Sequence, residues 1–274
     1  MFKYAVGLGI AGNFARHLEQ AGEMEDFKDL EVDDENGPKG IFPFYLKDFD
    51  GQLGTYPLSS DTIILPDDSS LNIQAEPEVA LICDMVHDRE NVISLTPKYF
   101  APYNDCSIRR QGAKKISEKK NWGEASKGIG EKMIEIDTFD AGGIMDSWHI
   151  ASFLRRDGVL HRYGEDAAMI TYSYFHKKLT DWIVNQLNSQ EDTGPLEAIH
   201  RYLRNLERVE QVVISIGATR YTPYGETTFL KAGDDIITAV YDSNSFDEET
   251  VMQNIDSQIY DAENMSVLLQ KVVS

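Results

Sequence analysis

The sequence predicts an α+β fold in which strands dominate and a few helices flank them. Residues 41–92 alternate short apolar runs with turn signals, which is typical of strands joined by tight loops. Residues 149–162 contain two strand-like runs joined through Asp157-Gly158, a strong hairpin signal. Residues 169–206 carry two helix-like segments that do not alternate regularly with strands. Strands on both sides of isolated helices favour an α+β domain over repeated βαβ units.

Each expected element follows from local periodicity and from its flanking turn residues. We expect strands at 2–6, 62–65, 79–83, 149–155, 159–162 and 212–216, and helices at 13–21, 169–187 and 196–206. The glycine- and lysine-rich stretch 111–130 is expected to form a loop near a site.

Composition limits the classes of partner. The chain has 274 residues and a net charge of −20, from 46 acidic and 26 basic side chains. Such a mean field repels polyanions, so we expect no nucleic-acid and no anionic-membrane partner, whereas a small anion needs only a local pair of cations. Cys83 and Cys106 cannot form a disulfide framework, and no apolar run has membrane-spanning length. A soluble, cytoplasmic protein is expected.

The glycines Gly7, Gly9 and Gly12 match the Gly-x-Gly-x-x-Gly fingerprint of dinucleotide-binding folds. They are expected between a strand and a helix, which is the context that the fingerprint needs. A Rossmann unit also needs a second parallel strand with an acidic end, for which only 30–33 is a candidate, and further strand–helix alternation. A nucleotide-binding oxidoreductase is therefore the alternative function, and a tight strand-to-helix turn is the simpler interpretation.

Two carboxylates precede an apolar strand. Glu76 and Glu78 are two residues apart, so on a strand both side chains lie on the same face and can converge on one cation. Pro77 between them cannot donate a ladder hydrogen bond, which favours a strand edge or bulge. Since Glu-x-Glu pairs are common in a chain this acidic, the pair needs further support.

That support comes from a second acidic motif and from two further cations. Asp105 is followed four residues later by Arg109, whose planar guanidinium matches a carboxylate bidentately. Lys127 lies between small residues in the glycine-rich stretch. His17 lies on the expected early helix as a candidate proton-transfer group. An ordinary surface ion pair, a solvated lysine and a structural histidine are the competing interpretations.

Taken together, these motifs resemble those of the fumarylacetoacetate hydrolase superfamily, in the same order along nearly the whole chain. The matching segments are 13–17 (Asn-Tyr-x-x-His in the family), 38–47, 63–66, 76–82 (Glu-x-Glu-apolar), 104–109 (Asn-Asp-x-x-x-Arg), 127–128 (Lys-Gly), 222–225 and 230–234. The resemblance implies one catalytic domain over 1–274: a mixed β-sandwich roll with a few flanking helices, in which 1–40 forms a strand and a lid helix.

The resemblance also implies a homodimer and a divalent metal, Mg²⁺ or Mn²⁺ with Ca²⁺ as a further option. All-carboxylate ligation independently suits hard cations. The expected substrate is a small dicarbonyl or anionic oxo-acid, and the expected reaction is C–C hydrolysis, decarboxylation or keto–enol tautomerisation through a metal-bound enolate. The implied site consists of metal ligands Glu76, Glu78 and Asp105, substrate-binding Arg109, Lys127, Thr222 and Tyr103, and catalytic His17, Lys127, Arg109 and Gln20.

Three departures from the family pattern mark a divergent branch. Hydrolytic members pair the lid histidine with a glutamate three residues later, where this chain has Gln20. A glutamine can orient an imidazole but supplies no negative charge, which favours decarboxylation or keto–enol exchange over hydrolysis. Glu131 replaces the family's Asp-Thr after the Lys-Gly loop, and 191–208 is an expected helical insertion. A catalytically retired binding protein is the remaining alternative.

Overall fold

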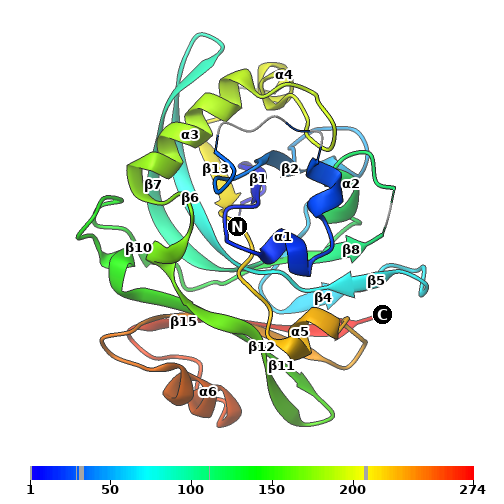
Figure 1. Cartoon of the computed structure of the whole chain (residues 1–274), viewed down its shortest axis with the longest axis vertical. Coiled ribbons are helices and arrows are strands. Elements are labelled where there is room, and N and C mark those ends of the chain that lie inside the picture. Colours follow the sequence, from blue (N-terminus) through cyan, green and yellow to red (C-terminus); the bar gives the residue numbers. More distant parts are fainter. Residues whose placement is uncertain (1, 29, 31–33, 111, 207–208) are drawn as a thin grey trace.

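The computed structural model describes residues 2–28, 30, 34–110, 112–206 and 209–274, and Figure 1 shows their arrangement. A large curled sheet lies above a second sheet in that view, so the α+β prediction is confirmed. In order across it, the large sheet contains β2 (Gly40–Tyr45), β1 (Val6–Ala11), β13 (Gln211–Ser215), β6 (Pro77–Asp88), β7 (Asn91–Asn104), β9 (Lys127–Ile129) and β3 (Leu58–Ser59), with β10 (Ile134–Glu135) beside β7. The second contains β12 (Val159–Ala168), β11 (Trp148–Arg156), β14 (Asp235–Asp242), β15 (Met265–Val273) and β4 (Thr62–Ile64).

The helices cover the outer faces of these sheets or lie at the mouth of the large one (Figure 1). Leu179, Ile183 and Leu187 repeat at helical spacing along α3 and are fully buried in the main apolar cluster. The helices are α1 (His17–Gln20), α2 (Ser117–Lys120), α3 (His176–Ser189), α4 (Ile199–Asn205), α5 (Pro223–Thr227) and α6 (Glu248–Asp256), and the remaining two-stranded sheet pairs β5 (Asn72–Gln74) with β8 (Ser107–Arg109). In the described part of the chain, none of these helices is long and apolar enough to cross a membrane.

The hairpin prediction is confirmed, because β11 and β12 pair antiparallel around Asp157 and Gly158, which have φ angles of 53° and 80°. Other predictions were wrong in extent. The helix expected at 169–187 is the short turn η4 (Met169–Thr171) followed by α3, which begins only at His176. The helix expected at 13–21 is the single turn α1, and the stretch 111–130 is more than a loop, because it contains α2 and β9. Residue 111 lies outside the described residues.

The first two glycines of the motif lie inside a strand, whereas Gly12 follows the strand with a φ of 76°. β1 begins at Val6, so the strand expected at 2–6 is displaced and Gly7 and Gly9 are strand residues. A Cβ on Gly7 would lie 2.2 Å from the Phe44 ring, and one on Gly9 would lie 2.3 Å from the Phe42 ring. The two glycines therefore make room for aromatic rings and do not form a phosphate-binding turn, which removes the basis of the nucleotide alternative. Of the candidate second strand, residues 31–33 lie outside the described residues.

Gly9→Ala is expected to destabilise the fold by about 1–3 kcal/mol, the usual cost of overpacking a core. The added methyl group would enter the space of the Phe42 ring, which is itself 2% exposed. Thermal denaturation measures the loss, and the double variant Gly9→Ala/Phe42→Leu should recover part of it. An unchanged melting temperature in Gly9→Ala would contradict the close approach of strand and ring.

The expected insertion at 191–208 packs against the segment that carries α2. Ser117 donates to Glu197 at 2.7 Å, and the backbone nitrogen of Ile116 donates to the Pro195 carbonyl at 3.1 Å. The ammonium of Lys115 donates to the Leu196 carbonyl at 2.6 Å. The insertion contains α4 as its helix, while residues 207–208 lie outside the described residues. Its contacts fix the position of α2 at the mouth of the large sheet.

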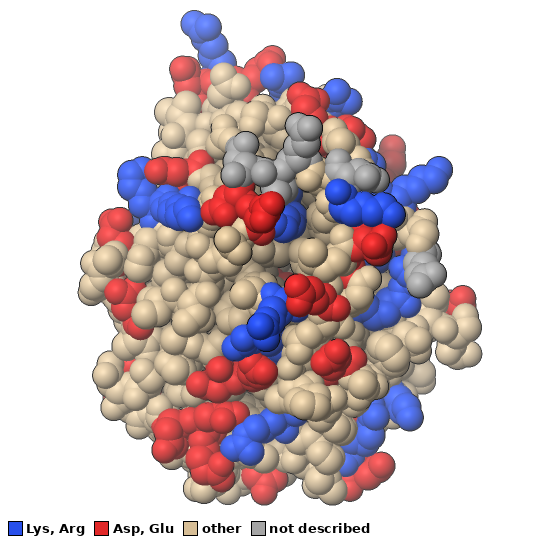
Figure 2. All heavy atoms as spheres, viewed as in Figure 1, with Lys and Arg blue, Asp and Glu red and all other residues tan. Residues whose placement is uncertain are grey.

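The face of the molecule seen in Figure 2 mixes acidic and basic side chains, and its described residues show no broad basic patch. The expectation that the chain binds no nucleic acid stays a prediction.

Candidate metal centre

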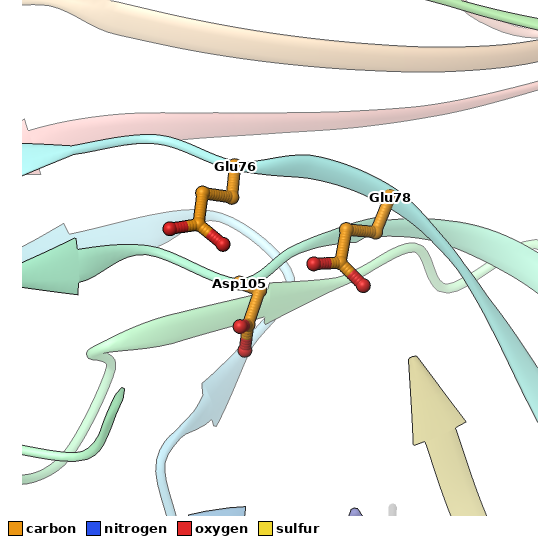
Figure 3. A group of neighbouring side chains, drawn as sticks. All are labelled: Glu76, Glu78 and Asp105. Atoms are coloured by element: carbon orange, nitrogen blue, oxygen red, sulfur yellow. The ribbon is translucent and has the colours of Figure 1, made fainter. Parts of the chain in front are cut away.

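Three carboxylates converge where β6 begins and β7 ends. The antiparallel pairing of Pro77 with Asn104 places Glu76 and Glu78 beside Asp105, and the Asp105 nitrogen donates to the Glu76 carbonyl at 2.9 Å. One oxygen of each side chain lies within 4.8 Å of the other two (Figure 3). All three residues are at most 3% exposed. The structure thus assembles the predicted triad in a buried pocket, with an oxygen donor set that suits a hard cation.

The side-chain alternation of β6 explains which face carries the site. Val79, Leu81 and Cys83 belong to the apolar cluster that α3 completes. Glu78 and Ala80 point to the opposite face, because successive strand residues alternate. The triad therefore lies on the face of the large sheet turned away from α3.

Three cationic side chains surround the triad. The Lys127 ammonium lies 2.5 Å from Oδ1 of Asp105. The Lys120 ammonium lies 2.5 Å from Oε2 of Glu76 and 2.6 Å from Oδ2 of Asp105, so it bridges two members of the triad. Arg109 contacts Oε1 of Glu76 at 2.8 Å.

The two lysines rest on the rings that the strand glycines accommodate. The ammonium of Lys120 lies 5.3 Å from the Phe42 ring centre, and that of Lys127 lies 5.6 Å from the Phe44 ring centre. Contacts at these distances favour a cation over an aromatic face. Through these contacts the glycine motif of β1 shapes the site indirectly.

Arg109 is held by internal partners. Its Nε donates to Gln74 at 2.7 Å, its Nη1 to Glu23 at 2.8 Å, and its Nη2 to the Tyr221 hydroxyl at 3.0 Å, in addition to the Glu76 contact. The same Glu23 oxygen lies 2.8 Å from the Lys119 ammonium. A substrate carboxylate would therefore have to compete with Glu23 for the guanidinium that was predicted to bind it.

The charges of these groups influence one another through a medium of low polarity. Burial favours the neutral form of Glu76, but Lys120 and Arg109 outweigh it and hold the pKa of this carboxyl below its usual range. Burial, with the negative charge of Asp105, raises the pKa of Glu78 well above the usual value, although its Oε2 accepts a hydrogen bond from the Gly217 nitrogen at 3.0 Å. Burial likewise lowers the pKa of the Lys127 ammonium.

His17 presents one nitrogen to the site. Its Nδ1 lies 2.9 Å from the Thr219 carbonyl, which can only accept, so Nδ1 carries the proton and Nε2 carries the lone pair. Nε2 is buried and has no hydrogen-bond partner among the described residues. Burial lowers the pKa of the imidazole, which favours its neutral form. A neutral imidazole with a free lone pair is suited to accept a proton.

A small cavity joins these groups. It measures about 20 Å³ and is lined by His17, Glu23, Glu76, Glu78 and Lys120, among others. That volume holds about one water molecule. A larger surface hollow of about 580 Å³ lies between α3 and the segment around Asp34 to Lys39, and no triad residue lines it.

Two further predicted site residues have other partners. The Gln20 amide donates to the Tyr221 carbonyl at 3.1 Å and accepts from the Tyr221 nitrogen at 2.9 Å, so it anchors α1 to the chain near α5 and does not orient the imidazole of His17. Thr222 caps α5, with its hydroxyl oxygen 3.2 Å from the Gly225 nitrogen and 2.8 Å from the Arg162 carbonyl. The predicted contacts of Gln20 with the imidazole and of Thr222 with substrate are therefore replaced by backbone contacts.

Tyr103 lies opposite Glu78 in the β6–β7 pair and is fully buried. Its hydroxyl has no hydrogen-bond partner among the described residues. Burial and the nearby Asp105 and Glu78 raise its pKa well above the usual value, so the hydroxyl keeps its proton and can serve as a donor. Glu131, the replacement after the Lys-Gly segment, accepts a hydrogen bond from Ser60 at 2.9 Å in an exposed position.

Comparison with known proteins places the chain in a family and a fold. The family described as "Family of unknown function (DUF5718)" matches residues 23–272. The chain belongs to this family. A search of the curated proteins finds no match.

Among solved structures, this DUF5718 protein is similar to Cg1458 with inhibitor (15% identity, TM-score 0.59, covering 100% of this chain and 78% of that one). It is similar to 2-keto-3-deoxy-D-arabinonate dehydratase complexed with magnesium and 2,5-dioxopentanoate (14%, TM-score 0.55, 99% and 73%). It is also similar to yeast ynq8, a fumarylacetoacetate hydrolase family protein (14%, TM-score 0.54, 100% and 96%). The fold is that of fumarylacetoacetate hydrolase-like proteins, which confirms the fold that the resemblance in the sequence implied.

The sequence analysis missed several groups in the centre of the DUF5718 protein. Lys119 and Lys120 come from the stretch expected to be a loop, and Glu23 follows α1, six residues after His17. The only local signal for Glu23 is its place after the lid motif. Gln74 and Tyr221, which hold Arg109, carry no sequence signal beyond lying near family motifs.

Proposed function

We propose that this DUF5718 protein is a metal-dependent hydrolase or lyase acting on a small dicarbonyl or oxo-acid. The observation that carries the proposal is the convergence of Glu76, Glu78 and Asp105 in one buried pocket of this fold. Lys127 and the free nitrogen of His17 add an ammonium and a proton acceptor beside them. Isolated carboxylates are expensive to bury, so three together indicate a site built for cations.

The donor set fits Mg²⁺ or Mn²⁺, with Ca²⁺ as a further option, because all three side chains offer hard oxygen ligands. A dehydratase of similar fold is itself complexed with magnesium and an oxo-compound. Glu76, Glu78 and Asp105 would hold the ion. Once bound, it would supply Lewis-acid polarisation of a substrate carbonyl.

The side chains of the protein supply the remaining functions. The Lys127 ammonium, beside Asp105, would offset negative charge that develops on a substrate oxygen. Nε2 of His17 would accept a proton from water or from substrate, with Nδ1 held by Thr219. Tyr103 would donate a hydrogen bond from its unpaired hydroxyl.

Substrate entry requires movement of the lid segment, α1 and the turn η1 (Met24–Phe27) that follows it. The closed cavity holds about one water, which is too small for an oxo-acid. The contacts that keep the segment closed are those of Gln20 with the Tyr221 backbone and of Glu23 with Arg109. When Glu23 moves away, the guanidinium of Arg109 becomes available to a substrate carboxylate.

The first test is a Mn²⁺ titration of the dialysed protein near neutral pH, followed by a panel of acylpyruvates and oxaloacetate monitored by loss of enol absorbance. Glu78→Ala should lose the metal, because a ligand is removed. Lys127→Ala should keep the metal and lose turnover. Absence of Mn²⁺ binding by the wild type, both alone and together with the oxo-acids of the panel, would contradict the metal proposal.

The panel also separates the reaction classes. Cleavage of acylpyruvates indicates a hydrolase, loss of CO₂ from oxaloacetate a decarboxylase, and enol loss without cleavage a tautomerase. Metal binding without turnover would indicate a catalytically retired binding protein. The hydrogen bonds between the Gln20 amide and the Tyr221 backbone favour this alternative, because Gln20 then does not orient the imidazole of His17. We also propose the homodimer that the resemblance implies, which analytical ultracentrifugation can test.

A further inference from the structure

The position of Lys120 has a consequence for metal binding. Its ammonium makes two short contacts, 2.5 Å to Glu76 and 2.6 Å to Asp105, and so lies between two of the three proposed metal ligands. A divalent ion that is ligated by the same two oxygens needs the space that the ammonium fills. The ammonium and the ion therefore cannot both occupy that position.

Lys120 is held in place by its own surroundings. Its side chain is 4% exposed, and the Phe42 ring lies beneath the ammonium at 5.3 Å. α2, which carries it, is anchored to the 191–206 segment by the bond from Ser117 to Glu197. The contact with the Phe42 ring and the anchored helix indicate that the buried position of Lys120 is a fixed feature of the fold.

The formal charges of the buried cluster also indicate that Lys120 and a metal ion compete. The buried cluster contains four carboxyl groups, Glu23, Glu76, Glu78 and Asp105. Four cationic groups face them, namely Arg109, Lys119, Lys120 and Lys127. Adding a divalent ion to a formally balanced cluster leaves two excess positive charges in a medium of low polarity, which is unfavourable unless an ammonium leaves or an anion enters.

We propose that Lys120 is a built-in competitor of the divalent metal: its ammonium occupies the cation position between Glu76 and Asp105 until a metal ion displaces it. This inference rests on the proposed function. The ligand class is a hard divalent cation, and an anionic substrate that arrives with it restores the charge balance. The lysine holds the carboxylates together without metal and weakens metal binding in the absence of substrate.

The test compares Mn²⁺ affinity in four proteins after removal of metal with a chelator. Lys120→Met keeps a side chain of similar length without the charge and is expected to bind Mn²⁺ at least tenfold more tightly than the wild type. Lys119→Met is the matched control, because Lys119 is the adjacent residue but pairs with Glu23. Its gain in Mn²⁺ affinity should be clearly smaller than that of Lys120→Met, because it removes the same formal charge but leaves the position between Glu76 and Asp105 filled. If Lys120→Met does not fold, Lys120→Gln replaces it in the comparison, because glutamine keeps a hydrogen-bond donor without the charge. The same gain in Mn²⁺ affinity is expected.

Affinity is measured by electron paramagnetic resonance of free Mn²⁺ and, independently, by the rise in melting temperature at saturating Mn²⁺. The rise should be larger in the Lys120 variants than in the wild type. If the wild type binds Mn²⁺ and the Lys120 variants bind it no more tightly, the competitor role is overturned and the proposed metal centre stands. If neither wild type nor variants bind Mn²⁺, the proposed function itself fails.

Discussion

Replacing Asp105 with asparagine is expected to lower the free energy of unfolding by about 3–5 kcal/mol, the usual cost of removing one partner from a buried ion pair. Asp105 is 0% exposed and pairs with two ammonium groups: Oδ1 accepts a hydrogen bond from Lys127, and Oδ2 lies 2.6 Å from Lys120 in an ion pair. An amide of the same shape keeps the packing but leaves both ammonium groups facing a neutral group. The same variant should lose Mn²⁺ binding, because an amide is a weaker ligand than a carboxylate.

Thermal and urea denaturation of the metal-free protein measure the change in stability. For a domain of this size, each kcal/mol shifts the melting temperature by about 2–4 °C, so a loss of roughly 10 °C is expected. Asp84→Asn is the matched control, since this β6 carboxylate is 55% exposed and lies 3.9 Å from Lys98. Exposed pairs contribute at most about 1 kcal/mol. Equal stability losses in the two variants would contradict the account of Asp105 as the centre of a buried charge cluster.

The triad was predictable because it depends on short-range rules. Alternation along a strand places Glu76 and Glu78 on one face, and an apolar strand ending at Asn104 presents Asp105 at its end. The order of family motifs then placed Asp105 beside the two glutamates, and the antiparallel pairing of β6 with β7 bears this out.

The strand that contains Gly7 and Gly9 was misplaced because the reason for those glycines is not local. They accommodate the rings of Phe42 and Phe44, which lie on a strand about thirty-five residues later. A glycine-rich stretch before an amphipathic segment matches a phosphate turn equally well from local pattern alone. Only the pairing of β1 with β2 separates the two interpretations.

Lys120 could not be predicted for a related reason. A lysine pair in a polar stretch has the pattern of a solvated helix face, and burial of its ammonium depends on carboxylates that lie at least fifteen residues away. The contact expected for Gln20 also depends on more than local spacing. Its spacing from His17 fits a contact on one helix face, but α1 is a single turn and the amide instead meets the backbone of Tyr221.

His17→Ala is expected to reduce kcat by about 10²–10⁴-fold on whichever oxo-acid is turned over, the range for loss of a positioned general base. Mn²⁺ affinity should stay within about twofold, because Nε2 of His17 is not among the carboxylate ligands and Nδ1 is bound to Thr219. His87→Ala is the control, since His87 also contacts a backbone carbonyl, that of Val209 at 2.8 Å, but is absent from the cavity lining. Full turnover by His17→Ala would exclude its role in proton transfer.

The pH profile distinguishes a proton-transfer role from a structural one. Burial lowers the pKa of His17, so the imidazole stays neutral at pH values where an ordinary histidine is protonated. A general base must be unprotonated to act, and the pH dependence of kcat/KM reports the ionisation of the free enzyme. The acidic limb of the kcat/KM profile is therefore expected at a pH below about 6.5, the ordinary pKa of histidine. The limb should disappear in the residual activity of His17→Ala and persist in His87→Ala. If His17 served only to hold α1 against Thr219, its removal would lower kcat and stability together while the acidic limb stayed in place.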